Sequence, residues 1–203
     1  RRVSRKVSHY EHVLGRLFGD VWQRNEPVTW VDVGAGYGEL LEAVSRLAPA
    51  GSRIEGLEPM RPKATAARGR GLLVTEDYLR PTHAQVQFIS FVDVFSHLPD
   101  FRAFLADVRY VLLPGGEIFM ETGNLADAED RSEFAGELGV PDHLVFAGER
   151  HIRGYLEESG LDVVRIERQR ADGLVNSAKC VLMSLLGLPT QLRFPYTSRY
   201  RQL

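Results

Sequence analysis

Cysteine is almost missing from this chain, and so are long apolar runs and any excess of charge of one sign. The single Cys180 excludes an internal disulfide and a metal site built from several cysteines. The longest apolar stretch, residues 180–186, is too short to span a bilayer. These absences predict a protein of the reducing cytoplasm with no membrane partner.

The charges nearly balance, with 25 Lys and Arg against 27 Asp and Glu. A net charge of −2 and a pI near 6.3 do not favour a nucleic-acid partner, so we expect a small neutral or anionic substrate. With 203 residues, 44% of them hydrophobic, the chain fits a single α/β domain over residues 1–203. Whether it forms a homodimer stays open.

Three glycines on alternate positions join an apolar strand, Thr29 to Val33, to an amphipathic helix. Glycine permits a positive φ and a close approach by a ligand, while the first amides of the following helix are unpaired donors. The spacing of Gly34, Gly36 and Gly38 differs from the dinucleotide fingerprint, because Glu39 stands where a third small residue should pack. The loop therefore predicts a nucleotide-like ligand but weakens the case for a pyrophosphate.

Asp32 lies two residues before the first glycine, at the carboxyl end of the strand, and suits a cationic ligand. This stretch resembles the first motif of the class I S-adenosylmethionine-dependent methyltransferases, and the resemblance extends to about residue 168. In that family the glycine loop lies against the methionine moiety and the ribose, which implies S-adenosylmethionine as cofactor and S-adenosylhomocysteine as product. The resemblance places these residues at the cofactor: Asp32, Gly34, Ala35, Gly36, Tyr37 and Gly38.

The order of elements predicts a doubly wound, mostly parallel sheet. The predicted strands are residues 29–33, 53–57, 72–74, 86–92, 117–121 and 161–168, and the predicted helices cover 9–22, the segment after the glycine loop, 61–68, the segment from 101 and 152–159. The resemblance adds a seventh, antiparallel strand at 198–203 that looks cut short. Within the domain we expect a lid helix in 1–25, a cofactor-binding core in 26–122, a substrate-pocket insertion in 123–150 and a C-terminal helix and strands in 151–203.

Two acidic turns follow the second and third predicted strands. Glu58 stands 22 positions after Gly36, where an acidic group accepts ribose hydroxyls in either a methyltransferase or an NAD enzyme. Glu58-Pro59-Met60 resembles the family's second motif, with Met60 on the adenine. Asp77 and its neighbour Tyr78 stand where similar enzymes hold the adenine amino group, although a solvated turn explains the same residues.

Residues 91–99, which end the fourth strand, resemble the family stretch that runs from a hydrophobic strand into His-Leu. The resemblance implies that Phe91 and Val92 face the cofactor and that Asp93 lies near the transferred methyl group. His97 is a candidate to orient the substrate or accept its proton, or it caps the following helix. Leu112 to Gly116 resembles the family's Leu-x-Pro-Gly-Gly turn, whose role is structural.

The segment from His143 to Phe146 resembles a histidine and phenylalanine box of the small-molecule branch, which makes His143 the preferred general base or substrate ligand. His9 and His12 are spaced as metal ligands can be, yet without further ligands we expect no metal.

The resemblance therefore implies a methyltransferase acting on a small molecule, at an oxygen in preference to a nitrogen or carbon, with a sugar, polyketide-like or other secondary metabolite as acceptor. An NAD-dependent oxidoreductase or epimerase is disfavoured by Gly38-Glu39, by the Pro114-Gly115-Gly116 turn and by the absence of a Tyr-x-x-x-Lys pair. A catalytically inactive partner subunit that binds S-adenosylmethionine stays an alternative.

Overall fold

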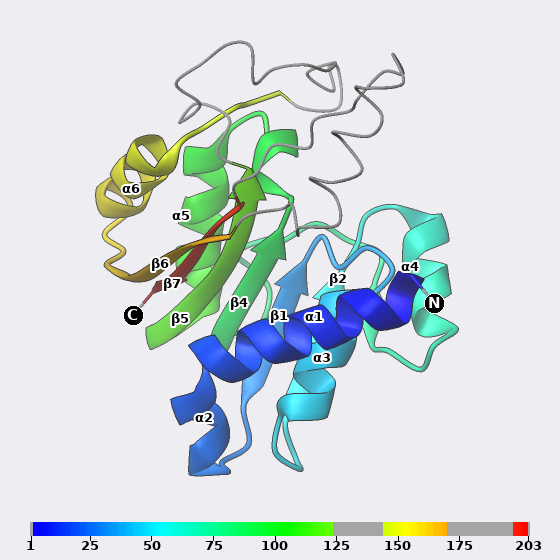
Figure 1. Cartoon of the computed structure of the whole chain (residues 1–203). Coiled ribbons are helices and arrows are strands. Elements are labelled where there is room, and N and C mark those ends of the chain that lie inside the picture. Colours follow the sequence, from blue (N-terminus) through cyan, green and yellow to red (C-terminus); the bar gives the residue numbers. More distant parts are fainter. Residues whose placement is uncertain (1, 124–143, 170–196, 203) are drawn as a thin grey trace, which may run out of the picture.

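The computed structural model describes residues 2–123, 144–169 and 197–202, which form one seven-stranded sheet between two layers of helices (Figure 1). The strand order is β3-β2-β1-β4-β5-β7-β6, and β7 is antiparallel to both of its neighbours. The strands are β1 (Thr29–Val33), β2 (Arg53–Leu57), β3 (Val74–Thr75), β4 (Val86–Val92), β5 (Leu112–Gly123), β6 (Val163–Gln169) and β7 (Thr197–Gln202). The predicted doubly wound sheet with an antiparallel last strand is confirmed.

Helices cover both faces of the sheet. One apolar cluster joins α1, α2 and α3 to β1, β4 and β5, and a second joins α5 and α6 to the opposite face (Figure 1). The helices are α1 (Arg2–Leu17), α2 (Gly19–Arg24), α3 (Glu39–Leu47), α4 (Arg61–Arg68), the short 3-10 helix η1 (Phe95–His97), α5 (Phe101–Val111) and α6 (Glu149–Glu158). Each core thus lies between one helical layer and the sheet.

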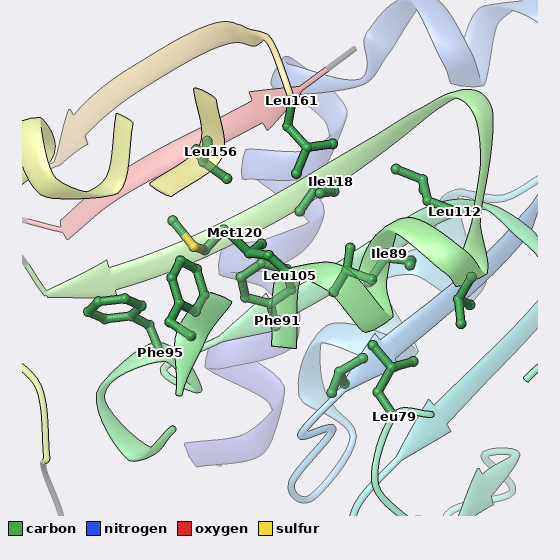
Figure 2. Packing of buried hydrophobic residues seen from close by; sticks show 14 of the residues in the cluster. Leu79, Ile89, Phe91, Phe95, Leu105, Leu112, Ile118, Met120, Leu156 and Leu161 are labelled. Atoms are coloured by element: carbon green, nitrogen blue, oxygen red, sulfur yellow. The ribbon is translucent and has the colours of Figure 1, made fainter. Parts of the chain in front are cut away.

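The alternation of side chains along each strand creates the two cores. In β1, Trp30 belongs to the cluster under α1, whereas Val31 and Val33 belong to the cluster under α5. β4 follows the same rule, because Phe88 faces α1 and Ile89 faces α5. Figure 2 shows the second core, where residues of β4 and β5 meet those of α5 and α6.

The predicted helix over 9–22 is wrong in its extent, because the structure has two helices separated at Phe18. α1 begins at Arg2, so the residues before position 9 are helical as well. Phe18 leaves helical geometry at φ −116° and ψ 24°. The break lets the rings of Phe18 and Trp22 both reach Trp30, and the Trp22 indole N–H donates to the Leu14 carbonyl at 3.0 Å.

The predicted turn before the fifth strand is also corrected. β5 begins at Leu112 and includes the Pro114-Gly115-Gly116 residues. Its pairing with β4 shifts in register, from Val86 with Leu112 to Phe88 with Glu117. The extra residues bulge out of the ladder, with Gly115 at φ +74°. The Pro-Gly-Gly segment that the sequence predicts as a turn is therefore an irregular part of a longer strand.

The other boundaries differ by a few residues. β3 lies at 74–75 rather than 72–74, α6 begins before the predicted 152, and β6 begins two residues after the predicted 161. Most of the predicted insertion over 123–150 lies outside the described residues. The division of the domain into a lid, a core and an insertion stays a prediction.

We expect Phe18→Ala to lower the free energy of unfolding by about 3–5 kcal/mol, because it would leave a cavity among large rings. Phe18 is 0% exposed, and its ring lies 5.3 to 6.3 Å from those of Trp22, Trp30, Phe88 and Phe119. Urea unfolding measures the change. Tyr110→Ala is the control, because Tyr110 is 67% exposed. An equal loss in both variants would show that Phe18 does not anchor α1 and α2 to the sheet.

Candidate functional site

The glycine loop between β1 and α3 is fastened to the end of β2. The amides of Gly34 and Ala35 both donate to the Leu57 carbonyl, at 2.8 and 3.0 Å. The Gly38 amide closes the loop by donating to the Ala35 carbonyl at 2.8 Å. The loop is therefore a fixed turn at the carboxyl edge of the sheet, where parallel α/β folds bind ligands.

Two of the glycines are required for different reasons. A Cβ on Gly38, which has φ +82°, would lie 2.3 Å from Leu72 Cδ1, so packing excludes a side chain there. At Gly36, with φ +58°, the nearest atom to an added Cβ is 3.9 Å away. The protein itself leaves room at Gly36, and the absent side chain opens that space to a ligand.

Glu58 lies directly after β2 and points at the glycine loop. Its Oε2 accepts the Gly36 amide and its Oε1 accepts the Met60 amide, both at 2.8 Å. The side chain is 5% exposed. Because each carboxylate oxygen has two acceptor sites, Glu58 keeps the capacity to accept two ligand hydroxyls.

Asp32 is the buried acid of the site, at 2% exposure. The register of β1 and β4 pairs it with Ser90, whose hydroxyl donates to Asp32 Oδ1 at 2.7 Å. The Trp30 indole N–H in turn donates to Ser90 Oγ at 2.9 Å. Ser90 was missed in the sequence, although a serine within the apolar run of β4 is a signal for a buried polar contact.

The pKa of Asp32 is raised from 3.8 to about 7. Burial is the largest cause, the Ser90 hydrogen bond opposes it, and the carboxylates of Glu58 and Glu39 add to the rise. The ionised form of Asp32 is thus costly without a positive charge nearby. A cationic ligand at this edge would relieve the repulsion among these carboxylates.

The turn after β3 places Asp77 and Tyr78 at the same edge of the sheet. Asp77 Oδ1 accepts the Tyr78 amide at 2.8 Å and the Arg80 guanidinium at 3.2 Å. The backbone hydrogen bond and, to a smaller extent, Arg80 hold the pKa of Asp77 below its ordinary value. Three large side chains in the turns at this edge are exposed. They are Tyr37, Met60 and Tyr78, with exposed fractions of 49%, 52% and 67%.

Three residues at the end of β4 were predicted to lie near the cofactor, and the structure places them in different environments. Phe91 is fully buried and packs against the Phe104 ring at 5.1 Å, so its main chain rather than its ring faces the edge. Val92 is half-buried and Asp93 is exposed. Asp93 adopts φ +55°, and its amide donates to the Glu121 carbonyl at 2.9 Å. This left-handed backbone turns the chain sharply at the strand end.

His97 ends η1 and is exposed. The neighbouring Ser96 carbonyl accepts the amides of Leu144 at 2.7 Å and Val145 at 3.3 Å. His143 lies outside the described residues, but it directly precedes Leu144. The main chain therefore brings Leu144 and Val145 against Ser96, the residue before His97.

Within residues 2–123, 144–169 and 197–202, no group of three or more His, Cys, Asp or Glu side chains is placed to hold a metal ion. None of the helices in the same ranges has both the length and the hydropathy that a membrane span requires.

Comparison with known proteins decides the family. The family model described as a methyltransferase domain matches residues 5–166. The chain belongs to this family. A search of curated protein sequences found no match.

Solved methyltransferase structures share the fold. A putative sarcosine dimethylglycine methyltransferase from Galdieria sulphuraria is 18% identical, with a TM-score of 0.69 over 95% of this chain and 84% of that one. A SAM-dependent methyltransferase from Archaeoglobus fulgidus is 17% identical, with a TM-score of 0.65 over 95% and 93%. Magnesium protoporphyrin IX methyltransferase from Synechocystis PCC 6803, with bound SAH, is 15% identical, with a TM-score of 0.63 over 97% and 81%. At these identities, the similarity is one of fold.

The cofactor that a methyltransferase domain of this class implies, S-adenosylmethionine, fits the described residues. Its positive charges match the acidic edge formed by Asp32, Glu39 and Glu58, and its ribose hydroxyls match the acceptor capacity of Glu58. Gly36 leaves the space that such a ligand needs beside the loop. No other cofactor is needed to explain these groups.

We expect Asp32→Asn to stabilise the ligand-free protein at high pH. Because the folded pKa is raised, protonated Asp32 supports the fold at low pH, and this support is lost as pH rises through about 7. The loss between pH 5 and 8 amounts to about 2–3 kcal/mol. Asparagine stays neutral and keeps an acceptor for Ser90, so its stability should fall less over this range.

Thermal unfolding at pH 5 and pH 8 measures this difference. The matched control is Asp162→Asn, at an exposed position, which should follow the wild-type dependence on pH. Parallel curves for wild type and Asp32→Asn would show that Asp32 is not the group that titrates.

Proposed function

We propose that this chain transfers a methyl group from S-adenosylmethionine to a hydroxyl oxygen of a small metabolite. The observation that carries the proposal is the joint placement of Glu58, Asp32 and the glycine loop. Glu58 bonds to the Gly36 amide, and the Asp32 carboxyl lies buried close enough for both Glu58 and Glu39 to raise its pKa. A cation carrying a diol matches this arrangement better than a pyrophosphate, which the same carboxylates would repel.

When bound, the cofactor supplies a sulfonium methyl group that needs no further activation. The residues of this chain then have two tasks, which are to align the partners and to remove the proton of the acceptor hydroxyl. Alignment falls to the loop, Glu58 and Asp32. For the proton we propose His143 or His97, because His97 directly follows Ser96 and His143 directly precedes Leu144, whose amide donates to the Ser96 carbonyl.

A small acceptor rather than a nucleic acid is supported by the balanced charge of the chain. The fold relatives include two whose names state a small-molecule substrate, sarcosine or dimethylglycine in one case and magnesium protoporphyrin IX in the other. A hydroxyl acceptor from secondary metabolism and a cytoplasmic location are part of the same proposal.

The first test is calorimetric binding of S-adenosylhomocysteine, with NAD as the competing ligand. We expect Glu58→Gln to weaken S-adenosylhomocysteine binding by about 10- to 100-fold, because hydrogen bonds to a charged group contribute about 1.5–3 kcal/mol. Glu55→Gln is the control, since Glu55 lies on β2, the strand that ends directly before Glu58, but pairs with Arg53. Binding of NAD alone would replace the proposal with an oxidoreductase.

The second test concerns the general base. Acceptors are screened by mass spectrometry with S-adenosylmethionine that carries a trideuterated methyl group. With an acceptor found, His97→Ala or His143→Ala should lower turnover by about 100-fold while S-adenosylhomocysteine affinity stays within about 2-fold. His12→Ala, an exposed residue of α1, is the control. Full turnover in both variants would refute histidine catalysis, and binding without any turnover would indicate an inactive partner subunit.

A further inference from the structure

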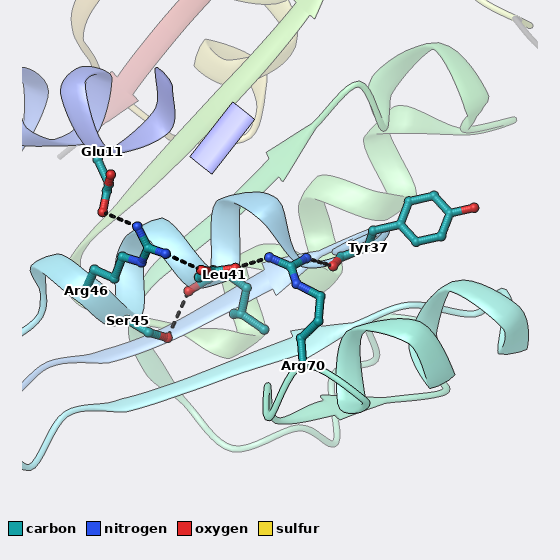
Figure 3. A network of polar contacts seen from close by, with 7 residues as sticks. Glu11, Tyr37, Leu41, Ser45, Arg46 and Arg70 are labelled. Carbon is teal, nitrogen blue, oxygen red and sulfur yellow. Dashed lines mark hydrogen bonds and ion pairs between the residues drawn. The ribbon is translucent and has the colours of Figure 1, made fainter. Parts of the chain in front are cut away.

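A single arginine outside the family motifs contacts the backbone of the glycine loop. Arg70 lies in the turn that follows α4, and its guanidinium donates to the Tyr37 carbonyl (Figure 3). Its other end-nitrogen forms an ion pair with Glu42 of α3. The side chains of Arg70 and Glu42 are 25% and 24% exposed, so solvent screens this pair only partly.

The contact fixes one peptide group from both sides. The Tyr37 carbonyl accepts from Arg70, and the amide on the same peptide, that of Gly38, donates to the Ala35 carbonyl at 2.8 Å. The two flanking glycines, Gly36 and Gly38, have positive φ and many accessible conformations when unrestrained. Holding this peptide therefore restricts the loop where glycine backbones would otherwise allow many conformations.

The turn that carries Arg70 also supports the loop by packing. Leu72, two residues later, fills the space beside Gly38, with its Cδ1 2.3 Å from where a Cβ would stand. The ring of Tyr37 points away from the ion pairs, so the contact to this residue is through the main chain (Figure 3). The turn after α4 thus meets the loop through one apolar and one polar contact.

Alternating charges extend from Arg70 to the first helix. Glu42 pairs with Arg46 at 2.5 Å, and Arg46 pairs with Glu11 of α1 at 3.2 Å (Figure 3). Arg46 binds Glu42 Oε1 whereas Arg70 binds Glu42 Oε2, so each arginine has its own oxygen of this carboxylate. Arginine suits this role because its planar fork serves two acceptors at once.

We propose that Arg70 is a positioning residue that holds the glycine loop in its ligand-binding conformation before the ligand arrives. A preformed loop lowers the ordering cost of binding, so affinity depends on a residue that does not itself touch the ligand. What the loop binds rests on the proposed function, whereas the effect of Arg70 on the loop does not.

The test is hydrogen exchange of the ligand-free protein, followed by S-adenosylhomocysteine binding. We expect Arg70→Gln to speed exchange of the Gly38 amide by about 10-fold and to weaken S-adenosylhomocysteine binding by a similar factor, with a melting temperature close to wild type. Arg70→Lys should lie between the two, because an ammonium replaces the two-pronged contact imperfectly.

Two matched controls separate positioning from general loss of charge. Arg68→Gln removes a neighbouring arginine that bonds to the Val74 carbonyl and Thr65 instead of the loop. Arg46→Gln removes the ion pairs to Glu42 and Glu11 but leaves the Tyr37 contact. We expect both to keep loop exchange within about 2-fold of wild type.

Wild-type exchange of residues 34–41 in Arg70→Gln, or the same acceleration in Arg46→Gln, would overturn the positioning role. If wild-type protein fails to bind S-adenosylhomocysteine, the proposed function fails, and the exchange measurement still decides what Arg70 does to the loop.

Discussion

The site depends on the attachment of the glycine loop to the end of the neighbouring strand. One carbonyl, that of Leu57, accepts the amides of both Gly34 and Ala35, and the next residue, Glu58, accepts that of Gly36. These three hydrogen bonds convert the parallel pairing of β1 and β2 into a rigid turn above the sheet. Glu58 and the loop are thus placed by the same stretch of backbone.

The acidic groups that suit the site to a cationic ligand also lower the stability of the ligand-free fold. Asp32, Glu39 and Glu58 repel one another, and burial makes the charge on Asp32 costly. A protein selected for stability alone would place neutral residues there. The Ser90 and Trp30 hydrogen bonds limit the cost by satisfying the acid within the sheet. The aromatic core beneath them, centred on Phe18, buries large apolar rings, and this burial offsets part of the cost of the acidic site.

The sequence predicted the parts that local pattern determines. Apolar strands and the glycine loop depend on neighbouring residues, and their positions agree with the structure to within a few residues. The break at Phe18 and the register shift before Glu117 were missed, because both depend on contacts with distant strands. Likewise, Asp32 and Glu58 follow from motifs, whereas Ser90 and Arg70 act through partners 58 and 33 positions away in the chain. No periodicity in a single sequence encodes such pairs.

The position of β7 constrains the order in which the sheet can be completed. β7 lies between β5 and β6, although it follows β6 in the sequence by more than the length of a strand. During synthesis, β6 leaves the ribosome before the strand to which it will be hydrogen-bonded. Strands β1 to β5, which carry the glycine loop, can pair as soon as they have been synthesised. β6 stays unpaired until β7 has also been synthesised. The nascent chain can therefore complete the edge that carries the glycine loop before the opposite border of the sheet is closed.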